Sequence, residues 1–396
     1  MRIATITFHQ HATNQMGSLQ SDLAKTQNDL ATATRLHSAA DDPAAMSQVN
    51  ALNVQMSASQ QYVTNGNFAT STLQLEEQAM SDATNTLQSA RDLALQANNP
   101  ALSAAQRADI AAQLTQQLQD LVSIGNRVDG SGNQLFAGSA SGTVPFALNG
   151  GSVAYMGSDK VSQIQVGPNQ RLSAGDTGAT VFMNIPAGNG TFTTSGATTN
   201  TGTGSIGVGT VANKAAWVPD TYTIAFTSPA DYTVTNSTGT VVATGNSFKD
   251  GDTISFNGVQ IPLTGTPKAG DSFTVAKAGT ASAFDTLQSL VTTLNDTTLN
   301  SAQISSRIGG ALRQIDNAIS NMTNVSAAVG ARINSITSSQ GAAQALQTNL
   351  TTAVSQLSDT DYAAAITKLN LEEVSLQAAQ QSYASISQLS LFKYLQ

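Results

Sequence analysis

Apolar residues recur at helical spacing in the first 130 residues of the chain. They fall three, four or seven positions apart with polar residues between them, and Leu73, Met80, Leu87 and Ala94 mark one such stripe. A one-sided stripe of this period is typical of an amphipathic helix. The N-terminal third of the sequence therefore predicts a series of helices.

Start and stop signals divide these helices. Asp42 followed by Pro43 predicts a helix start, because an aspartate accepts hydrogen bonds from free N–H groups and proline fits the first helical position. The sequence NNP at residues 98–100 predicts a helix end. Ser103, followed three residues later by glutamine, has the pattern of a capping box. We expect both Asp41 and Asp42 to be capping groups rather than an acid–base pair.

The C-terminal part carries a longer stripe. Apolar residues recur at the same period over residues 308–357, about 75 Å of chain at ~1.5 Å per helical residue. A stripe of this length without strong caps predicts a coiled-coil-like rod. The sequence SDTD at residues 358–361 predicts the start of a last helix, and Ser282 predicts a cap for a helix that precedes the rod.

The middle of the chain is rich in turn-forming residues. Of the 31 glycines 24 lie in residues 130–279, and seven of the nine prolines lie in residues 145–267, so helices give way to turns there. Asn257-Gly258 is typical of a hairpin turn. Residues 189–209, rich in Gly, Thr, Ser and Asn, predict an exposed loop or an extended connection. Strands are predicted where β-branched and aromatic residues are enriched: residues 221–227, 232–235, 240–244 and 253–256.

Composition narrows the function classes. The 396 residues carry a formal net charge of −8 with 11% charged residues and no cysteine. The missing cysteine excludes disulfide scaffolds and thiol chemistry. The acidic balance argues against nucleic acid as a partner, since phosphate binding needs clustered Lys and Arg. No apolar run reaches the length that spans a bilayer, and the first residues lack the layout of a cleaved secretory signal.

No catalytic, cofactor-binding or metal site is predicted. His9 and His11 stand in a polar stretch without carboxylates at ligand spacing, so we expect solvated side chains. His37 continues a helical stripe and is predicted to be a packing residue. The glycine-rich middle contains neither a P-loop nor a dinucleotide-binding fingerprint. The sequence thus favours a protein that is not an enzyme and needs no cofactor.

The apolar stripes at the two ends leave two interpretations open. Neither terminal helix can bury its stripe alone. The helices could form a bundle within one chain. Alternatively, the ends pair with each other and with neighbouring copies, in which case the termini build an assembly and the middle is displayed outward.

Several segments resemble the flagellin family in order and position. The best match is LSDTDYAAAITKLNLEEVSLQAAQQSYASISQLSLFKYL, and the opening MRI and closing SLFKYL are more similar to members that join the hook to the filament than to filament subunits. Arg91 stands where the family has a recurrent arginine. The matching segments are residues 1–10, 34–53, 87–100, 132–139 and 357–395.

The resemblance implies an α+β fold, in which long terminal α-helices form a coiled-coil or helical-bundle rod with an inserted β-rich outer domain. Residues 1–42 and 357–396 are expected to form the inner coiled-coil region. Residues 43–140 and 282–356 are expected to form an elongated helical bundle domain, and residues 141–281 the outer domain.

The resemblance also implies a structural role in the bacterial flagellum, as a junction layer between the hook side and the flagellin filament. The expected partners are identical subunits, a neighbouring hook-associated protein, flagellin, an export chaperone and the type III export apparatus. The expected location is extracellular, reached without a cleavable signal, with no nucleic acid bound and no membrane insertion. A filament flagellin subunit is the first alternative. A chemoreceptor-like signalling rod is the second, opposed by the β-rich middle.

Assembly is expected to use the apolar stripes of the two terminal helices. Residues of the first helix would pack with residues of the last helix, and the polar faces would meet neighbouring subunits. The predicted interface consists of Ile3, Ile6, Leu19, Leu23, Leu30, Leu369, Leu376, Tyr383, Ile386 and Leu389.

Overall fold

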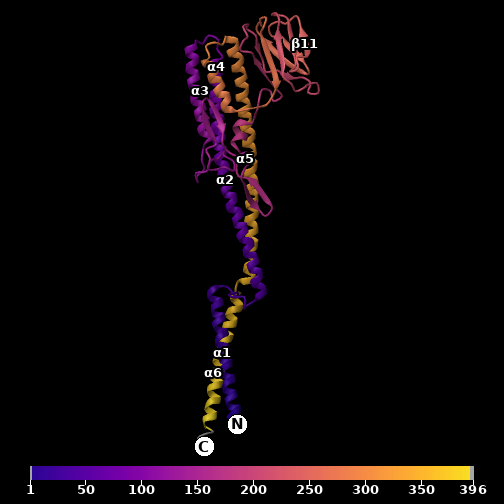
Figure 1. Ribbon diagram of the computed structural model, residues 1–396. Helices are drawn as coiled ribbons and strands as arrows, with labels where there is room; N and C mark the ends of the chain where they lie inside the picture. The colour runs from indigo at the N-terminus through magenta and orange to yellow at the C-terminus, as the bar shows by residue number, and fades with distance from the viewer. Residues whose placement is uncertain (1, 393–396) are drawn as a thin grey trace. The chain divides into compact units, whose positions relative to one another are not determined.

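Long helices at both ends flank a central β-rich region, which confirms the predicted α+β fold (Figure 1). The computed structural model describes the backbone of residues 2–392 and the side chains of residues 6–387. Every helix among these residues is too short or too polar to cross a lipid bilayer. The six α-helices of this described part are α1 (Arg2–Thr32), α2 (Pro43–Ala97), α3 (Ala104–Gly125), α4 (Ala283–Asn295), α5 (Ser301–Ser358) and α6 (Tyr362–Phe392).

The chain divides into two compact units. Met1–Thr64 and Gln340–Gln396 make one unit, called here the terminal unit, and Asn65–Ser339 make the other, called the central unit. Helices α2 and α5 contribute residues to both units. The predicted division into three regions has different boundaries and stays a prediction.

Helix ends follow the caps expected from the sequence. The Asp42 carboxylate accepts hydrogen bonds from the backbone N–H groups of Ala44 and Ala45 at 3.1 and 3.0 Å, so α2 begins at Pro43. Ser103 and Gln106 form both hydrogen bonds of a capping box, because each side chain accepts from the backbone N–H of the other residue. Ser282 accepts from two N–H groups of the first turn of α4. These three helix starts are confirmed.

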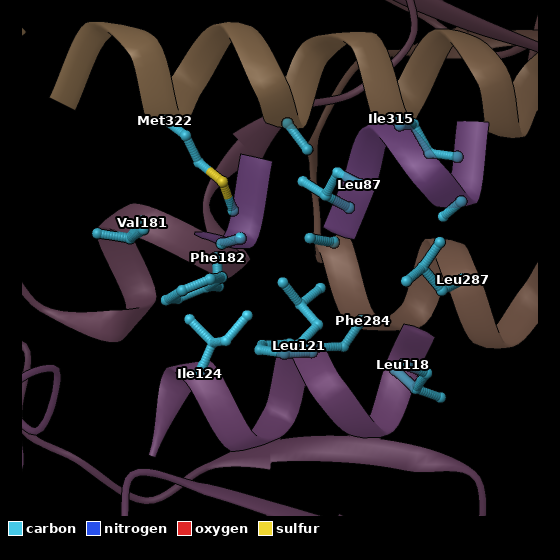
Figure 2. Close-up of a cluster of buried hydrophobic side chains, with 14 of the residues drawn as sticks. Leu87, Leu118, Leu121, Ile124, Val181, Phe182, Phe284, Leu287, Ile315 and Met322 are labelled. Atoms are coloured by element: carbon cyan, nitrogen blue, oxygen red, sulfur yellow. The ribbon is translucent and has the colours of Figure 1, made fainter. Parts of the chain in front are cut away.

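Four helices and a π-helical turn, η1 (Ala179–Met183), enclose the main hydrophobic core of the central unit. Figure 2 shows side chains from all five elements converging: Leu87 of α2, Leu121 of α3, Phe182 of η1, Phe284 of α4 and Met322 of α5. Buried alanines on α2 let its neighbours approach closely. The stripes read from the sequence are thus the faces turned to this core.

Phe182 is at the centre of an aromatic cluster in this core. Its ring centroid lies 5.2 Å from that of Phe136, 5.5 Å from that of Phe146 and 5.4 Å from that of Phe284. Aromatic pairs at such distances contribute energy beyond the area that they bury. The cluster fastens η1 and the strand that holds Phe146 to helix α4.

Fifteen short strands are found among the described residues. They form a five-stranded sheet in the order β11-β10-β9-β14-β6, a smaller sheet in the order β12-β13-β7 with β8 also paired to β13, and the pairs β1-β2, β3-β4 and β5-β15. The pairs are antiparallel. Their bounds are β1 (Phe146–Asn149), β2 (Ser152–Tyr155), β3 (Gln163–Gly167), β4 (Gln170–Ser173), β5 (Ile185–Pro186), β6 (Phe192–Gly196), β7 (Ser205–Ile206), β8 (Thr210–Val211), β9 (Tyr222–Phe226), β10 (Tyr232–Thr235), β11 (Val241–Gly245), β12 (Thr253–Phe256), β13 (Val259–Thr264), β14 (Ser272–Lys277) and β15 (Thr280–Ala281).

The two larger sheets share a second hydrophobic core, distinct from the core of the helices. Alternating residues of β9, such as Tyr222 and Phe226, are buried in it, and Trp217 packs at its edge. The predicted turn at Asn257-Gly258 joins β12 to β13 and has φ angles of 42° and 77°. These positive angles suit asparagine and glycine, which confirms the hairpin.

Of the two predictions for residues 189–209, the exposed loop is wrong, and the extended connection is in part a paired strand. This stretch contains β6, which pairs with β14 along its length, and Phe192 is fully buried. The buried Asp271 carboxylate accepts from the N–H groups of Thr201 and Gly202 at 2.7 and 3.0 Å. A Cβ on Gly202 would lie only 2.4 Å from that carboxylate. The glycine-rich composition thus reflects close backbone packing rather than exposure.

The residues predicted as one outer domain divide between the two cores. Phe146, Val166 and Phe182 belong to the core formed with the helices, whereas residues from Phe192 to Val275 form the core of the two larger sheets. The strands nearest the helices are therefore part of the helical body, and only the larger sheets form a separate lobe.

Candidate assembly surface

Helices α1 and α6 lie side by side in the terminal unit (Figure 1). The ring of His9 on α1 meets the ring of Tyr383 on α6 edge to face, with centroids 5.4 Å apart. The two ends of the chain, more than 300 residues apart in sequence, therefore pair with each other.

The residues predicted for the interface differ in exposure. Leu19, Leu23 and Leu30 on α1 are half-buried, and so are Leu369, Leu376 and Tyr383 on α6. Ile6 and Ile386 are exposed. The side chains of Ile3 and Leu389 lie outside those that the structure describes. The set as an assembly interface stays a prediction.

Further apolar residues on the terminal helices lie open to solvent and escaped the sequence analysis as interface residues. Leu371 and Val374 on α6 are 67% and 63% exposed, and Phe8, Tyr362 and Ile366 are also exposed. A search for one amphipathic stripe finds Tyr362 and Ile366 but misses Leu371 and Val374, because α6 carries apolar residues on more than one face. Complete burial of such a side chain contributes about 1.5–3 kcal/mol. The surface can therefore gain substantial free energy when another apolar face covers it.

Two segments that lie between helices, residues 33–42 and residues 357–361, contact each other in the terminal unit. We call them together the register clamp. The backbone N–H of Arg35 donates to the carbonyl of Ser358 at 2.7 Å, and its Nε donates to the carbonyl of Leu357 at 3.0 Å. The N–H of Thr360 donates to the carbonyl of Ala33 at 3.0 Å. These hydrogen bonds between the two segments fix the position of α1 along α6.

Asp41 organises one side of the register clamp instead of capping α2. Its carboxylate accepts from Lys25 Nζ at 2.6 Å, from the Ser38 N–H at 2.9 Å and from the His37 N–H at 3.2 Å. The hydrogen bond with Lys25 is the main reason that the pKa of Asp41 lies well below its usual range, and the same bond raises the pKa of Lys25. The expectation of two capping aspartates thus holds only for Asp42.

His37 is not a helical packing residue, contrary to the prediction. It follows α1 in the register clamp, and its Nε2 lies 2.8 Å from an Asp29 carboxylate oxygen. The stripe that pointed to a helical position continues in sequence past Ala33, but the backbone there turns to a φ of 60° and ends the helix. A polar contact in the clamp replaces the expected apolar one.

Replacing Asp41 with asparagine is expected to speed hydrogen exchange at the backbone amides of His37 and Ser38. The neutral amide loses the ion pair with Lys25 and accepts the backbone bonds less strongly. Exchange measured residue by residue at neutral pH checks this, with Asp22→Asn on the exposed side of α1 as the control. Because the pKa of Asp41 is lowered, its contribution is present above the ordinary value of about 3.9 and is lost on further acidification. Equal exchange in both variants would contradict the role of Asp41.

The described residues contain no group of three or more His, Asp or Glu side chains placed to hold a metal ion. Their most distinctive surface is instead the apolar one on α1 and α6, set beside a polar clamp. Such a surface favours association with other helices.

Comparison with known proteins places both ends of the chain in one family. The family model for the bacterial flagellin N-terminal helical region matches residues 3–141, and the model for the flagellin C-terminal helical region matches residues 312–395. Together these segments contain all of α2, α3 and α6, and all of α1 except its first residue. The family models thus match the paired helices that carry the apolar surface.

Individual relatives are similar in sequence over part of the chain and, in three dimensions, over more of it. The flagellar hook-associated protein 3 of Salmonella typhimurium is 31% identical over 185 residues, which are 47% of this chain and 58% of that protein. The match therefore spans less than two thirds of that curated relative.

Two crystal structures from Legionella pneumophila are similar over nearly their whole length. The first, of hook-associated protein 3, has a TM-score of 0.73 and 31% identity, covering 78% of this chain and 98% of that one. The second, described as the flagellar junction protein FlgL, has a TM-score of 0.68 and 32% identity, covering 74% and 99%.

Proposed function

We propose, from the premise that this chain belongs to the bacterial flagellin family, that it forms a structural layer joining the hook side of a flagellum to the flagellin filament. The observation that carries this proposal is the exposed apolar surface of the paired helices α1 and α6. A single chain leaves Leu371 and Val374 in water, and stacking against further copies would cover them. The similarity to hook-associated protein 3 supports the same role.

The partners follow from this position in the flagellum. Identical subunits would lie side by side in a ring or layer, a hook-associated protein would lie on the hook side, and flagellin on the filament side. An export chaperone and the type III export apparatus would deliver the chain to its extracellular site. The role is structural and not enzymatic, in keeping with relatives that are named flagellar hook-associated protein 3.

A filament flagellin subunit is the rival within the same family. The two family models alone do not separate the roles, because both describe flagellin helices. The match to hook-associated protein 3 structures over nearly their full length favours the junction. The β-rich lobe and the family membership oppose a chemoreceptor-like signalling rod.

Deleting the gene from its source bacterium is the direct test of the junction role. We expect cells that keep their hooks, release flagellin monomers into the medium and recover filaments when the gene is restored. Immunogold labelling of complemented cells should give one spot at the boundary between hook and filament. Labelling along the whole filament would show a filament subunit instead, and unchanged filaments in the deletion strain would exclude both roles.

A further inference from the structure

Glu76 carries a buried carboxyl group in the central unit, where α2, residues 174–178 and Arg332 of α5 meet. It lies on α2 and is only 1% exposed. Its Oε1 accepts a hydrogen bond from the backbone N–H of Asp176 at 3.0 Å. Its Oε2 is also buried and has no hydrogen-bond partner among the described residues. Since a buried carboxylate oxygen without a partner is costly, this atom needs a proton or a donor.

The segment over Glu76, residues 174–178, is held from several sides. Arg332 of α5 forms an ion pair with the Asp176 carboxylate and donates from a terminal nitrogen to the Gly175 carbonyl at 3.2 Å. The N–H of Gly178 donates to the Phe136 carbonyl at 2.8 Å. The same segment forms part of the wall of a cavity of about 260 Å³. Residues 174–178 therefore attach α2 to α5 and close one side of this cavity.

The charges in this cluster do not balance if both carboxyl groups are ionised. Asp176 and Arg332 are the charged groups that act on Glu76, and the single guanidinium already pairs with Asp176. A second carboxylate at 1% exposure would be an unpaired buried charge beside a like charge. Burial first, and then the charge of Asp176, raise the pKa of Glu76 to about 8, against the opposing effect of Arg332.

We propose that a proton on Glu76 is part of the attachment of residues 174–178 to α2, so that closure of this segment is linked to pH. The protonated carboxyl is neutral in the closed state and its hydroxyl can donate to the Asp176 carboxylate. When the segment opens, water reaches Glu76 and the carboxyl releases its proton at ordinary acidity. Rising pH thus favours the open state of the segment.

The sign and size of this linkage follow from the two pKa values. Glu76 has a raised pKa in the closed state, so its contribution to closure is complete below the ordinary value of about 4.3. The contribution falls as pH rises and is lost at about pH 8, where the closed state also ionises. Between these limits the equilibrium constant for opening rises by up to about tenfold per pH unit, or roughly several thousandfold in total.

Hydrogen exchange at the Asp176 and Gly178 amides tests the proposal. Their protection, divided by the intrinsic exchange rate at each pH, is measured from pH 5 to 9 in the full chain. We expect protection in the native protein to fall steeply up to about pH 8 and then level off. Glu76→Gln, a neutral side chain of the same shape, should show no such slope. Glu77→Gln, its exposed neighbour on α2, should keep the native slope.

A second measurement covers the case in which Glu76→Gln does not fold. The infrared band of a protonated carboxyl in the native protein should persist at pH 6.5, where exposed carboxyl groups are ionised, and disappear above pH 8. The proposal is supported if protection in the native protein falls with pH as described and this band is present at pH 6.5. A flat protection profile in the native protein, an equal slope in Glu76→Gln, or absence of the band at pH 6.5 would overturn it.

Discussion

Replacing Leu371 with aspartate is expected to give a folded, exported chain that no longer holds filaments on the hook. Leu371 is 67% exposed on α6, so the single chain loses little packing. If neighbouring subunits cover this side chain, each contact loses about 1.5–3 kcal/mol of apolar burial and gains an unpaired charge. That loss weakens each contact at least about tenfold. Since every subunit in the layer carries the change, we expect few or no attached filaments.

Complementation of a deletion strain measures this effect. The strain expressing Leu371→Asp is scored for filaments per cell, for swimming, and for flagellin and the variant chain in the medium. Asn370→Asp places the same charge at the neighbouring exposed position, where a polar residue already stands. It is expected to behave like the native chain. Normal filaments with Leu371→Asp would show that this face of α6 remains uncovered in the assembly.

Local patterns predicted much of the fold because the forces that set those elements are local. Residues 232–235 and 253–256 are strands as predicted, since their β-branched and aromatic residues alternate on a half-buried surface. The helix starts at Pro43 and Ala104 follow from side chains that cap the nearest N–H groups. Such signals need no knowledge of distant partners.

The elements that the sequence analysis missed depend on distant partners. Strand β6 is stabilised by β14, some 80 residues later, and its own composition of Thr, Ser and Gly is typical of a loop. His37 reaches its place because the backbone turns at Ala33, whose carbonyl accepts a hydrogen bond from the backbone N–H of Thr360. A local pattern does not contain these contacts.

The candidate surface was predicted in part for a similar reason. The apolar stripes on the terminal helices indicate that each helix needs a partner, and the structure pairs α1 with α6. The periodicity does not show that α6 carries apolar residues on another face, where Leu371 and Val374 are exposed. Likewise, Glu76 and Glu77 are adjacent acids in the sequence, and only the fold shows that one is buried and the other exposed.

Replacing Phe182 with alanine is expected to destabilise the central unit by about 3–5 kcal/mol. The side chain is fully buried, and its ring meets three other aromatic rings in the core shown in Figure 2. Truncation removes the buried ring and leaves a cavity that the rigid helices around it only partly fill. Because a domain has a net stability of only about 5–15 kcal/mol, a change of this size is a large fraction of the total.

Denaturant unfolding followed by two probes measures this loss. Circular dichroism reports the helices, and fluorescence of Trp217, the one tryptophan, reports the lobe formed by the larger sheets. Phe68→Ala, at a half-exposed position on α2, is the matched control and should change the stability by less than about 1 kcal/mol. Since η1 joins the lobe to the helices through β5, we expect both probes to shift together in Phe182→Ala. A shift no larger than that of Phe68→Ala would show that the aromatic cluster does not stabilise the unit, and a shift confined to circular dichroism would show that the lobe unfolds on its own.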